Sequence, residues 1–142
     1  KLQGLRYVEY MDYRIEFDPE TYPYRIPKLT IQPLVENAIY HGIKESRSRG
    51  LISIEGCIRE QSLIITVCDT GKGIEPARLK EIQDSLESGK STSGDSFGLG
   101  NIAQRLKLLY ADQYRMQIES IPGRFTAVMI RIPLCEWEED GV

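Results

Sequence analysis

Residues 29–42 read LTIQPLVENAIYHG, and their apolar residues recur at the spacing of a helix with one buried face. Pro33 is expected in the first turn, where its missing N–H is no loss, and Gly42 is a typical stop signal. The stretch therefore predicts a helix that packs one side against a core. The residues of that side are Ile31, Leu34, Val35 and Ala38.

Two polar residues, Asn37 and His41, stand one turn apart on the border of this apolar face. A carboxamide and an imidazole in that position could line a cleft. Each also has a plainer interpretation, since an Asn on a helix border is often solvated and a His near a helix end is often a surface residue or a partner of the helix dipole. The helix alone leaves these alternatives open.

The composition is that of one ordinary globular domain. The chain has 142 residues and a net charge of −3, which argues against nucleic acid as the main partner. No apolar run approaches the ~20 residues of a membrane helix, and no signal peptide is visible. Because the chain begins at Lys1 rather than Met, we expect a piece of a longer protein, whose membrane span, if any, would lie upstream.

Three cysteines without C-x-x-C spacing predict neither a zinc site nor a disulfide framework. Cys57 and Cys68 fall in strand-like runs and are expected to be small core residues in a reducing compartment. A cytoplasmic location is the resulting prediction.

Alternating and helical patterns predict about five strands and three helices. Hairpins are expected at residues 51–58 with 63–68, the second strand being central and buried, and at 114–120 with 126–132 around Pro122-Gly123. These elements favour the α+β class: a two-layer α/β sandwich whose mixed, mostly antiparallel sheet is covered on one face by the helices. Besides residues 29–42, helices are predicted at 76–86 and 101–110, and an edge strand is predicted at 13–18.

The segment DTGKG, residues 69–73, places an acceptor at the end of a buried strand and two glycines in the turn that follows. A carboxylate with little water around it could accept a hydrogen bond from an exocyclic amine such as that of adenine. Glycines allow the backbone to approach a flat ring. A tight turn capped by Asp69 is the alternative.

The segment GDSFGLGN, residues 94–101, follows a stretch of Gly, Ser and Thr and begins a helix. Residues 87–96 can bury almost nothing and are expected to form a mobile lid or loop. Backbone N–H groups at a helix start behind glycines make an anion site, for which phosphate is the obvious occupant. The pattern is neither a Walker A motif nor a dinucleotide fingerprint, and it could also be a plain loop before a helix.

The order of the three segments resembles the ATP-binding domain of the gyrase, heat-shock chaperone, histidine kinase and mismatch-repair superfamily, the Bergerat fold. Within it, PLVENAIYHG followed by DTGKG and FGLGNIAQRL is similar to the catalytic domain of sensor histidine kinases of the LytS/YesM type. The likeness covers residues 13–133. It implies ATP and Mg²⁺ as ligands.

The resemblance implies a role for each matching residue. Asn37 would coordinate Mg²⁺ on the ATP phosphates, and Asp69 would bind the adenine amino group within a wall shaped by Gly71 and Gly73. His41 stands where relatives have an aromatic residue beside the nucleotide, and Thr126 matches a threonine near adenine. The second glycine box, against the phosphates, would comprise Gly98, Leu99, Gly100 and Asn101.

The chain departs from the family pattern at several positions. Pro33 replaces a second Asn or an acid, so Glu36 is the nearest carboxylate and a candidate base, with contact to a helix pair as the alternative. Tyr40 replaces a phosphate-binding cation, which Lys44 or the lid residue Lys90 is expected to supply. Phe125 precedes Thr126 where Gly is usual, which weakens the assignment of that threonine.

The resemblance also implies a division of the chain. Residues 1–10 would end a dimerisation helix pair that carries the phosphoacceptor, residues 11–135 would form the ATP-binding catalytic domain, and residues 136–142 an acidic tail. His41 is the only histidine and lies in the nucleotide motif, so the γ-phosphoryl would go to a His outside this chain and then to a response regulator. The parent is expected to be a homodimer with a membrane anchor. Another ATPase or an anti-sigma-factor type of serine kinase, or an interaction module gated by nucleotide, stays open as the alternative.

Overall fold

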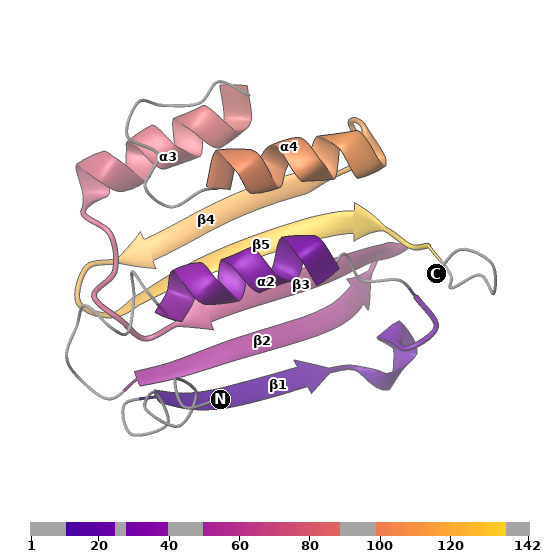
Figure 1. The fold of residues 1–142 in the computed structure, drawn as a ribbon, viewed down its shortest axis with the longest axis horizontal. Helices are drawn as coiled ribbons and strands as arrows, with labels where there is room; N and C mark the ends of the chain where they lie inside the picture. The colour runs from indigo at the N-terminus through magenta and orange to yellow at the C-terminus, as the bar shows by residue number, and fades with distance from the viewer. Residues whose placement is uncertain (1–10, 25–27, 40–49, 89–98, 136–142) are drawn as a thin grey trace.

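The fold is a five-stranded sheet with helices on one side, shown in a computed structural model that describes residues 11–24, 28–39, 50–88 and 99–135 (Figure 1). The strands lie in the order β1-β2-β3-β5-β4. Along the chain the elements are β1 (Met11–Phe17), the short 3-10 helix η1 (Pro19–Thr21), α2 (Lys28–Asn37), β2 (Gly50–Arg59), β3 (Ser62–Asp69), α3 (Pro76–Ser88), α4 (Leu99–Tyr110), β4 (Arg115–Ile121) and β5 (Phe125–Pro133).

The sheet is mixed, because β1 pairs with β2 in parallel whereas the other three pairs are antiparallel. Strand β3 occupies the centre and β1 an edge, as predicted, and the two predicted hairpins are the pairs β2–β3 and β4–β5. Helices α2, α3 and α4 lie on the same face of the sheet (Figure 1). The predicted α+β sandwich, with its mostly antiparallel sheet, is confirmed.

The hydrophobic core fills the space between this sheet face and the helices. Period-two alternation in β2 and β3 turns every second side chain toward the helices, which is why the buried residues of β3 are Leu63, Ile65, Val67 and Asp69. Helix α2 contributes Leu34, Ala38 follows directly after the helix, and α4 contributes three more residues to the core. Those residues are Leu99, Ile102 and Leu106.

The prediction that Pro33 lies in a first turn is wrong. Helix α2 begins at Lys28, so Pro33 is an interior residue that cannot donate a hydrogen bond to the carbonyl of Leu29. The stripe of apolar side chains packed on the core, including Leu34 at 2% exposure, offsets that loss. The predicted stop at Gly42 lies outside the described residues.

The expectation that Cys57 and Cys68 are core residues is also wrong. Both thiols are only partly buried, and strand alternation places them on the sheet face that the helices leave uncovered. Burial and the nearby charges of Asp69 and Glu55 raise the pKa of the Cys68 thiol. Its thiolate is therefore disfavoured.

Among the described residues, no helix is both long and apolar enough to cross a membrane.

Candidate functional site

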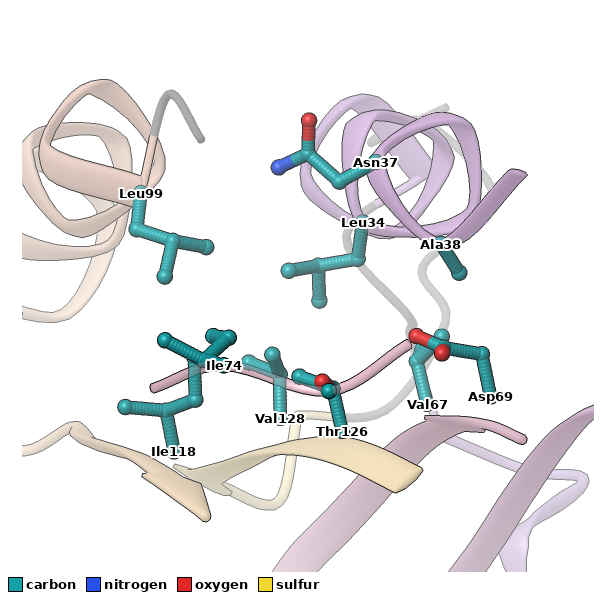
Figure 2. A pocket seen from close by; sticks show the side chains of 11 residues that line it. Leu34, Asn37, Ala38, Val67, Asp69, Ile74, Leu99, Ile118, Thr126 and Val128 are labelled. Atoms are coloured by element: carbon teal, nitrogen blue, oxygen red, sulfur yellow. The ribbon is translucent and has the colours of Figure 1, made fainter. Parts of the chain in front are cut away.

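A cavity opens between α2, the start of α4 and the edge of the sheet where β3 ends (Figure 2). Side chains from segments far apart in the sequence line it, with an aliphatic floor and a few polar groups. Figure 2 shows Asn37 projecting from α2 above that floor and the carboxylate of Asp69 entering from the end of β3. The lining residues are Leu34, Asn37, Ala38, Val67, Asp69, Gly73, Ile74, Leu99, Ile118, Thr126 and Val128.

Asp69 is a buried carboxyl group, with 4% of its surface exposed. One of its oxygens, Oδ1, accepts a hydrogen bond of 2.9 Å from the N–H of Gly71. Removal from water disfavours the carboxylate and raises the pKa of Asp69 to about 6, although the bond from Gly71 opposes that shift. The group is thus a buried acceptor in a nearly dry wall, and its bond to Gly71 also makes it the cap of the turn, which is the alternative that the sequence left open.

The turn after Asp69 is held against the β4–β5 hairpin. The Lys72 carbonyl accepts a 2.6 Å bond from the N–H of Gly123. Gly73 has a φ of +72°, and a Cβ there would lie 2.3 Å from the carbonyl oxygen of Ile121. Gly73 is therefore required by its backbone conformation and by the close approach of the hairpin.

Thr126 and Ser120 continue the polar edge of the cavity across the sheet. Thr126 stands directly opposite Asp69 on one side and opposite Ser120 on the other. The Ser120 hydroxyl accepts a 2.8 Å bond from the N–H of Ile74, donates a 2.6 Å bond to the Phe125 carbonyl, and lies 3.0 Å from Thr126 Oγ1. Sequence reasoning missed Ser120, although the predicted hairpin around Pro122-Gly123 already implied that residues 120 and 126 face each other.

The structure brings together most of the predicted site residues that it describes. Asn37, Asp69, Gly73, Leu99 and Thr126 line the cavity. The buried Gly71 holds Asp69, as its predicted place in the wall requires.

Other predicted site residues lie around the cavity rather than in its wall. Glu36 is exposed, and its Oε2 accepts a 3.4 Å bond from Gln32 Nε2. Gly100 and Asn101 form part of the first turn of α4, where Asn101 is exposed. The predicted residues outside the described part of the chain are His41, Lys44, Lys90 and Gly98, together with residues 89–96 of the expected lid. The first two lid residues, 87 and 88, belong to the end of α3, so that part of the prediction is wrong.

The enclosed space measures about 30 Å³, far below the ~300 Å³ or more of a typical ligand pocket. It has room for little more than a water molecule. A purine is larger than this space. The described residues thus form the inner end of a candidate site, which the polar side chains of Asn37, Asp69 and Thr126 line.

The sequence of residues 25–136 matches the family described as histidine kinase-, DNA gyrase B-, and HSP90-like ATPase. The chain belongs to this ATPase family. The resemblance derived from the three segments is thus confirmed at the level of the family.

Relatives of the chain are named as sensor kinases. Over 132 residues it is 33% identical to sensor histidine kinase YesM of Bacillus subtilis, covering 93% of this chain and 21% of YesM. Over 139 residues it is 30% identical to sensor protein kinase HptS of Staphylococcus aureus, covering 98% of this chain and 26% of HptS. The chain thus spans about a fifth to a quarter of the length of these relatives.

Solved structures share the fold at low sequence identity. The catalytic domain of histidine kinase ThkA superposes with a TM-score of 0.62 and 18% identity, over 93% of this chain and 84% of that one. The histidine kinase domain of the blue-light activated kinase from Erythrobacter litoralis gives 0.59 and 17%, over 93% and 60%. The fold of this ATPase-family chain is therefore that of histidine kinase catalytic domains.

Proposed function

We propose that the chain binds Mg-ATP between α2, the turn after β3 and the start of α4, as the catalytic domain of a sensor histidine kinase. One observation carries the proposal: Asn37 and Asp69, which come from different elements of an ATPase-family chain, line the same cavity. Had the two side chains opened onto different faces of the molecule, no single nucleotide could contact both.

The purine belongs at the Asp69 end of the cavity. The Asp69 carboxylate accepts a hydrogen bond from the adenine amino group, since its two oxygens can accept further bonds beside the one that Oδ1 receives from the Gly71 N–H. Gly73 lines the cavity beside Asp69, and the side on which a Cβ would stand is occupied by the backbone of Ile121. The aliphatic floor, with Val67 and Val128, supplies an apolar surface under the base.

The triphosphate extends toward α4 and the Asn37 side of the cavity. The amide oxygen of Asn37 is a hard ligand that fits Mg²⁺, which in proteins also keeps waters and substrate phosphates in its shell. When bound, the ion neutralises charge on the phosphates. The first turn of α4, which contains Gly100 and Asn101, adds the positive end of that helix dipole to the same side. Within the described residues, no group of three or more His, Cys, Asp or Glu side chains is placed to hold a metal.

In the parent kinase the γ-phosphoryl passes to a histidine outside this chain. The bond from the γ-phosphorus to the bridging oxygen of ADP breaks, a bond to the imidazole nitrogen forms, and ADP leaves; a response regulator then receives the group. This rests on the names of the relatives YesM and HptS, and on the complex of ThkA with the response regulator protein TrrA. The exposure of Glu36 favours contact with the phosphoacceptor helix pair over a role as base. A homodimeric parent with this domain in the cytoplasm is part of the same proposal.

The test is a thermal melt with and without Mg-ATP, followed by transfer of labelled phosphate to a helix pair from a related kinase. A ligand that binds only the folded state stabilises it by about 2.7 kcal/mol at a hundred times its Kd, so the melting temperature should rise. Asp69→Asn should lose most of that rise, while the exposed control Asp84→Asn should keep it.

The two steps of this test have separate outcomes. An unchanged melting curve at millimolar nucleotide contradicts binding itself. Binding without transfer contradicts the kinase assignment and favours a nucleotide-gated interaction module.

A further inference from the structure

Ser120 lies next to the cavity but does not line it. Its side chain is half-buried at the end of β4, directly opposite Thr126 in the register of the β4–β5 hairpin. Its hydroxyl oxygen has three polar neighbours: the N–H of Ile74, the carbonyl of Phe125 and the hydroxyl of Thr126. One atom thus connects the turn after Asp69, the start of β5 and the wall of the site.

The direction of these bonds follows from counting protons. A serine hydroxyl has one proton to donate, and a carbonyl oxygen can only accept. Because the 2.6 Å bond to the Phe125 carbonyl uses the Ser120 proton, the 3.0 Å contact must be donated by Thr126 to Ser120. The Ile74 N–H then fills the second acceptor position of the Ser120 oxygen.

This assignment determines what Thr126 offers to the cavity. Its proton points away, toward Ser120, so Thr126 Oγ1 faces a ligand only with lone pairs. Asp69, directly opposite on β3, also presents an acceptor when it is ionised. The two protons of a 6-amino group can satisfy two neighbouring acceptors, whereas a 6-oxo group donates to neither and the N1–H beside it supplies only one proton.

We propose that Ser120 is a positioning residue that fixes Thr126 as a hydrogen-bond acceptor and so selects purines with a 6-amino group over purines with a 6-oxo group. This rests on the proposed nucleotide site and adds its specificity. Ser120 acts through Thr126 and does not touch the nucleotide. Without its hydroxyl, Thr126 can rotate its proton into the site and donate to a 6-oxo group.

The experiment measures Kd for Mg-ATP and Mg-ITP by calorimetry and uses their ratio as the readout. ITP differs from ATP at the base alone, having a 6-oxo group and an N1 proton. Ser120→Ala should reduce the ATP preference roughly tenfold, the size expected for one misdirected polar contact in a buried site. Ser120→Thr, which keeps the hydroxyl, should retain the preference. Ser53→Ala is the matched control, because Ser53 lies on the uncovered face of the sheet.

A second pair of variants separates this role from a merely structural one. Losing the acceptor for the Ile74 N–H could weaken both nucleotides, but that effect cancels in the ratio. If Ser120 acts through Thr126, then Ser120→Ala should change the ratio in the wild-type background and leave it unchanged in the background of Thr126→Val. Should Ser120→Ala not fold, as judged by circular dichroism, Ser120→Cys keeps the size with a much weaker hydrogen-bonding group.

Several results overturn the proposal. A wild-type ratio near one shows that the row of acceptors does not select the base, while ATP binding itself stands. An unchanged ratio in Ser120→Ala, or an equal change in the Thr126→Val background, removes the positioning role and also leaves the nucleotide site intact. Failure of the wild-type protein to bind either nucleotide contradicts the proposed function, and the specificity proposal falls with it.

Discussion

Two rows of side chains cross the same five strands on the helix-covered face, four residues apart along each strand, and they serve opposite purposes. Both follow directly from the register of the sheet. The core row consists of Phe17, Gly56, Ile65, Ile130 and Met116. The site row consists of Tyr13, Ile52, Asp69, Thr126 and Ser120. The two rows differ only in their position along the strands, because they use the same strands and the same face of the sheet.

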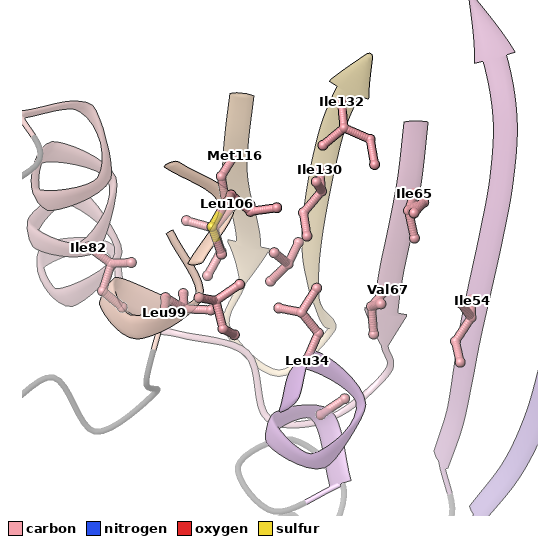
Figure 3. Packing of buried hydrophobic residues seen from close by; sticks show 14 of the residues in the cluster. Leu34, Ile54, Ile65, Val67, Ile82, Leu99, Leu106, Met116, Ile130 and Ile132 are labelled. Carbon is pink, nitrogen blue, oxygen red and sulfur yellow. The ribbon is translucent and has the colours of Figure 1, made fainter. Parts of the chain in front are cut away.

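The core row is closed over by apolar side chains. Ile65 and Ile130 are completely buried, and Figure 3 shows Ile130 between Ile65 and Met116, with Leu106 of α4 close to Met116. In the site row the last three members are polar, and Asp69 is buried with a pKa raised to about 6. Apolar burial in the core row therefore stabilises the fold, whereas burial of the Asp69 carboxylate in the site row destabilises it. The difference locates the site where inward-facing residues change from apolar to polar.

The largest expected effect comes from breaking the core row with Ile65→Ala. Removing a buried aliphatic side chain leaves a cavity and should lower the free energy of unfolding by ~2–5 kcal/mol. Denaturation in urea measures the loss. Ile64→Ala is the matched control, because Ile64 is the neighbour of Ile65 on the uncovered face of the sheet and is only partly buried. Equal losses for the two variants would contradict the assignment of the core to one face.

In the site row, Asp69→Asn should raise the free energy of unfolding, whereas Ile65→Ala lowers it. The pKa of Asp69 is raised in the folded state, from 3.8 to about 6, so its protonated form favours folding below pH 3.8 and that advantage disappears as the pH rises through 6. Asn carries no charge to bury and still accepts the Gly71 N–H. At pH 7 we therefore expect a gain in unfolding free energy of up to about 3 kcal/mol.

The gain in stability should be accompanied by a loss of function. Asp69→Asn should weaken ATP at least tenfold, since a charged acceptor is replaced by an amide. Triphosphate alone should be affected much less. A variant that is both less stable and unchanged in ATP binding would contradict the assignment of this row as the site.

Gly56→Ala tests the other end of the core row. A Cβ at Gly56 would lie 2.3 Å from Cδ2 of the Phe17 ring, which covers this glycine from the edge strand. The ring or the backbone must shift, at a cost of ~1–3 kcal/mol. The double variant with Phe17→Leu should recover part of the loss. Thermal unfolding of both variants measures the coupling, and purely additive losses would argue against the contact.

The sequence could predict the strands and their faces, because alternation is a local signal. The runs 51–58 and 63–68 fall within β2 and β3, and three motifs in a fixed order indicated which residues converge. Helix boundaries were less accessible. Pro33 suggested a start that packing overrides, since a helix beginning at Lys28 places the apolar stripe of α2 over the sheet.

What the sequence could not supply was the connection between the motifs. The hydrogen bond from the Ile74 N–H to the Ser120 hydroxyl joins residues 46 positions apart. Nothing in the local sequence around Ser120 marks it as the acceptor of that bond. The alternation of Met116, Ile118 and Ser120 was a usable signal for the direction of that side chain. Its three hydrogen bonds depend on how the turn after Asp69 rests on the hairpin, which no local pattern encodes.

The smallest expected effect is the pH dependence of ATP binding. It tests whether the ionised carboxylate of Asp69, which has no counterpart in the core row, contributes to that binding. If the carboxylate of Asp69 accepts the adenine amino group, affinity should follow its ionised fraction. With a pKa of about 6, that fraction falls roughly fourfold between pH 7.5 and 5.5, so Kd should rise by the same factor. Calorimetry at constant ionic strength measures the change.

Asp69→Asn serves as the control for that measurement, because it removes the titrating group and leaves any contribution from the phosphates. The wild-type slope minus the slope of this variant is then the part due to Asp69. A difference of zero would mean that the purine does not contact the carboxylate. Tighter binding at low pH would mean that the protonated carboxyl of Asp69 donates a hydrogen bond to the base, which would contradict its proposed role as an acceptor.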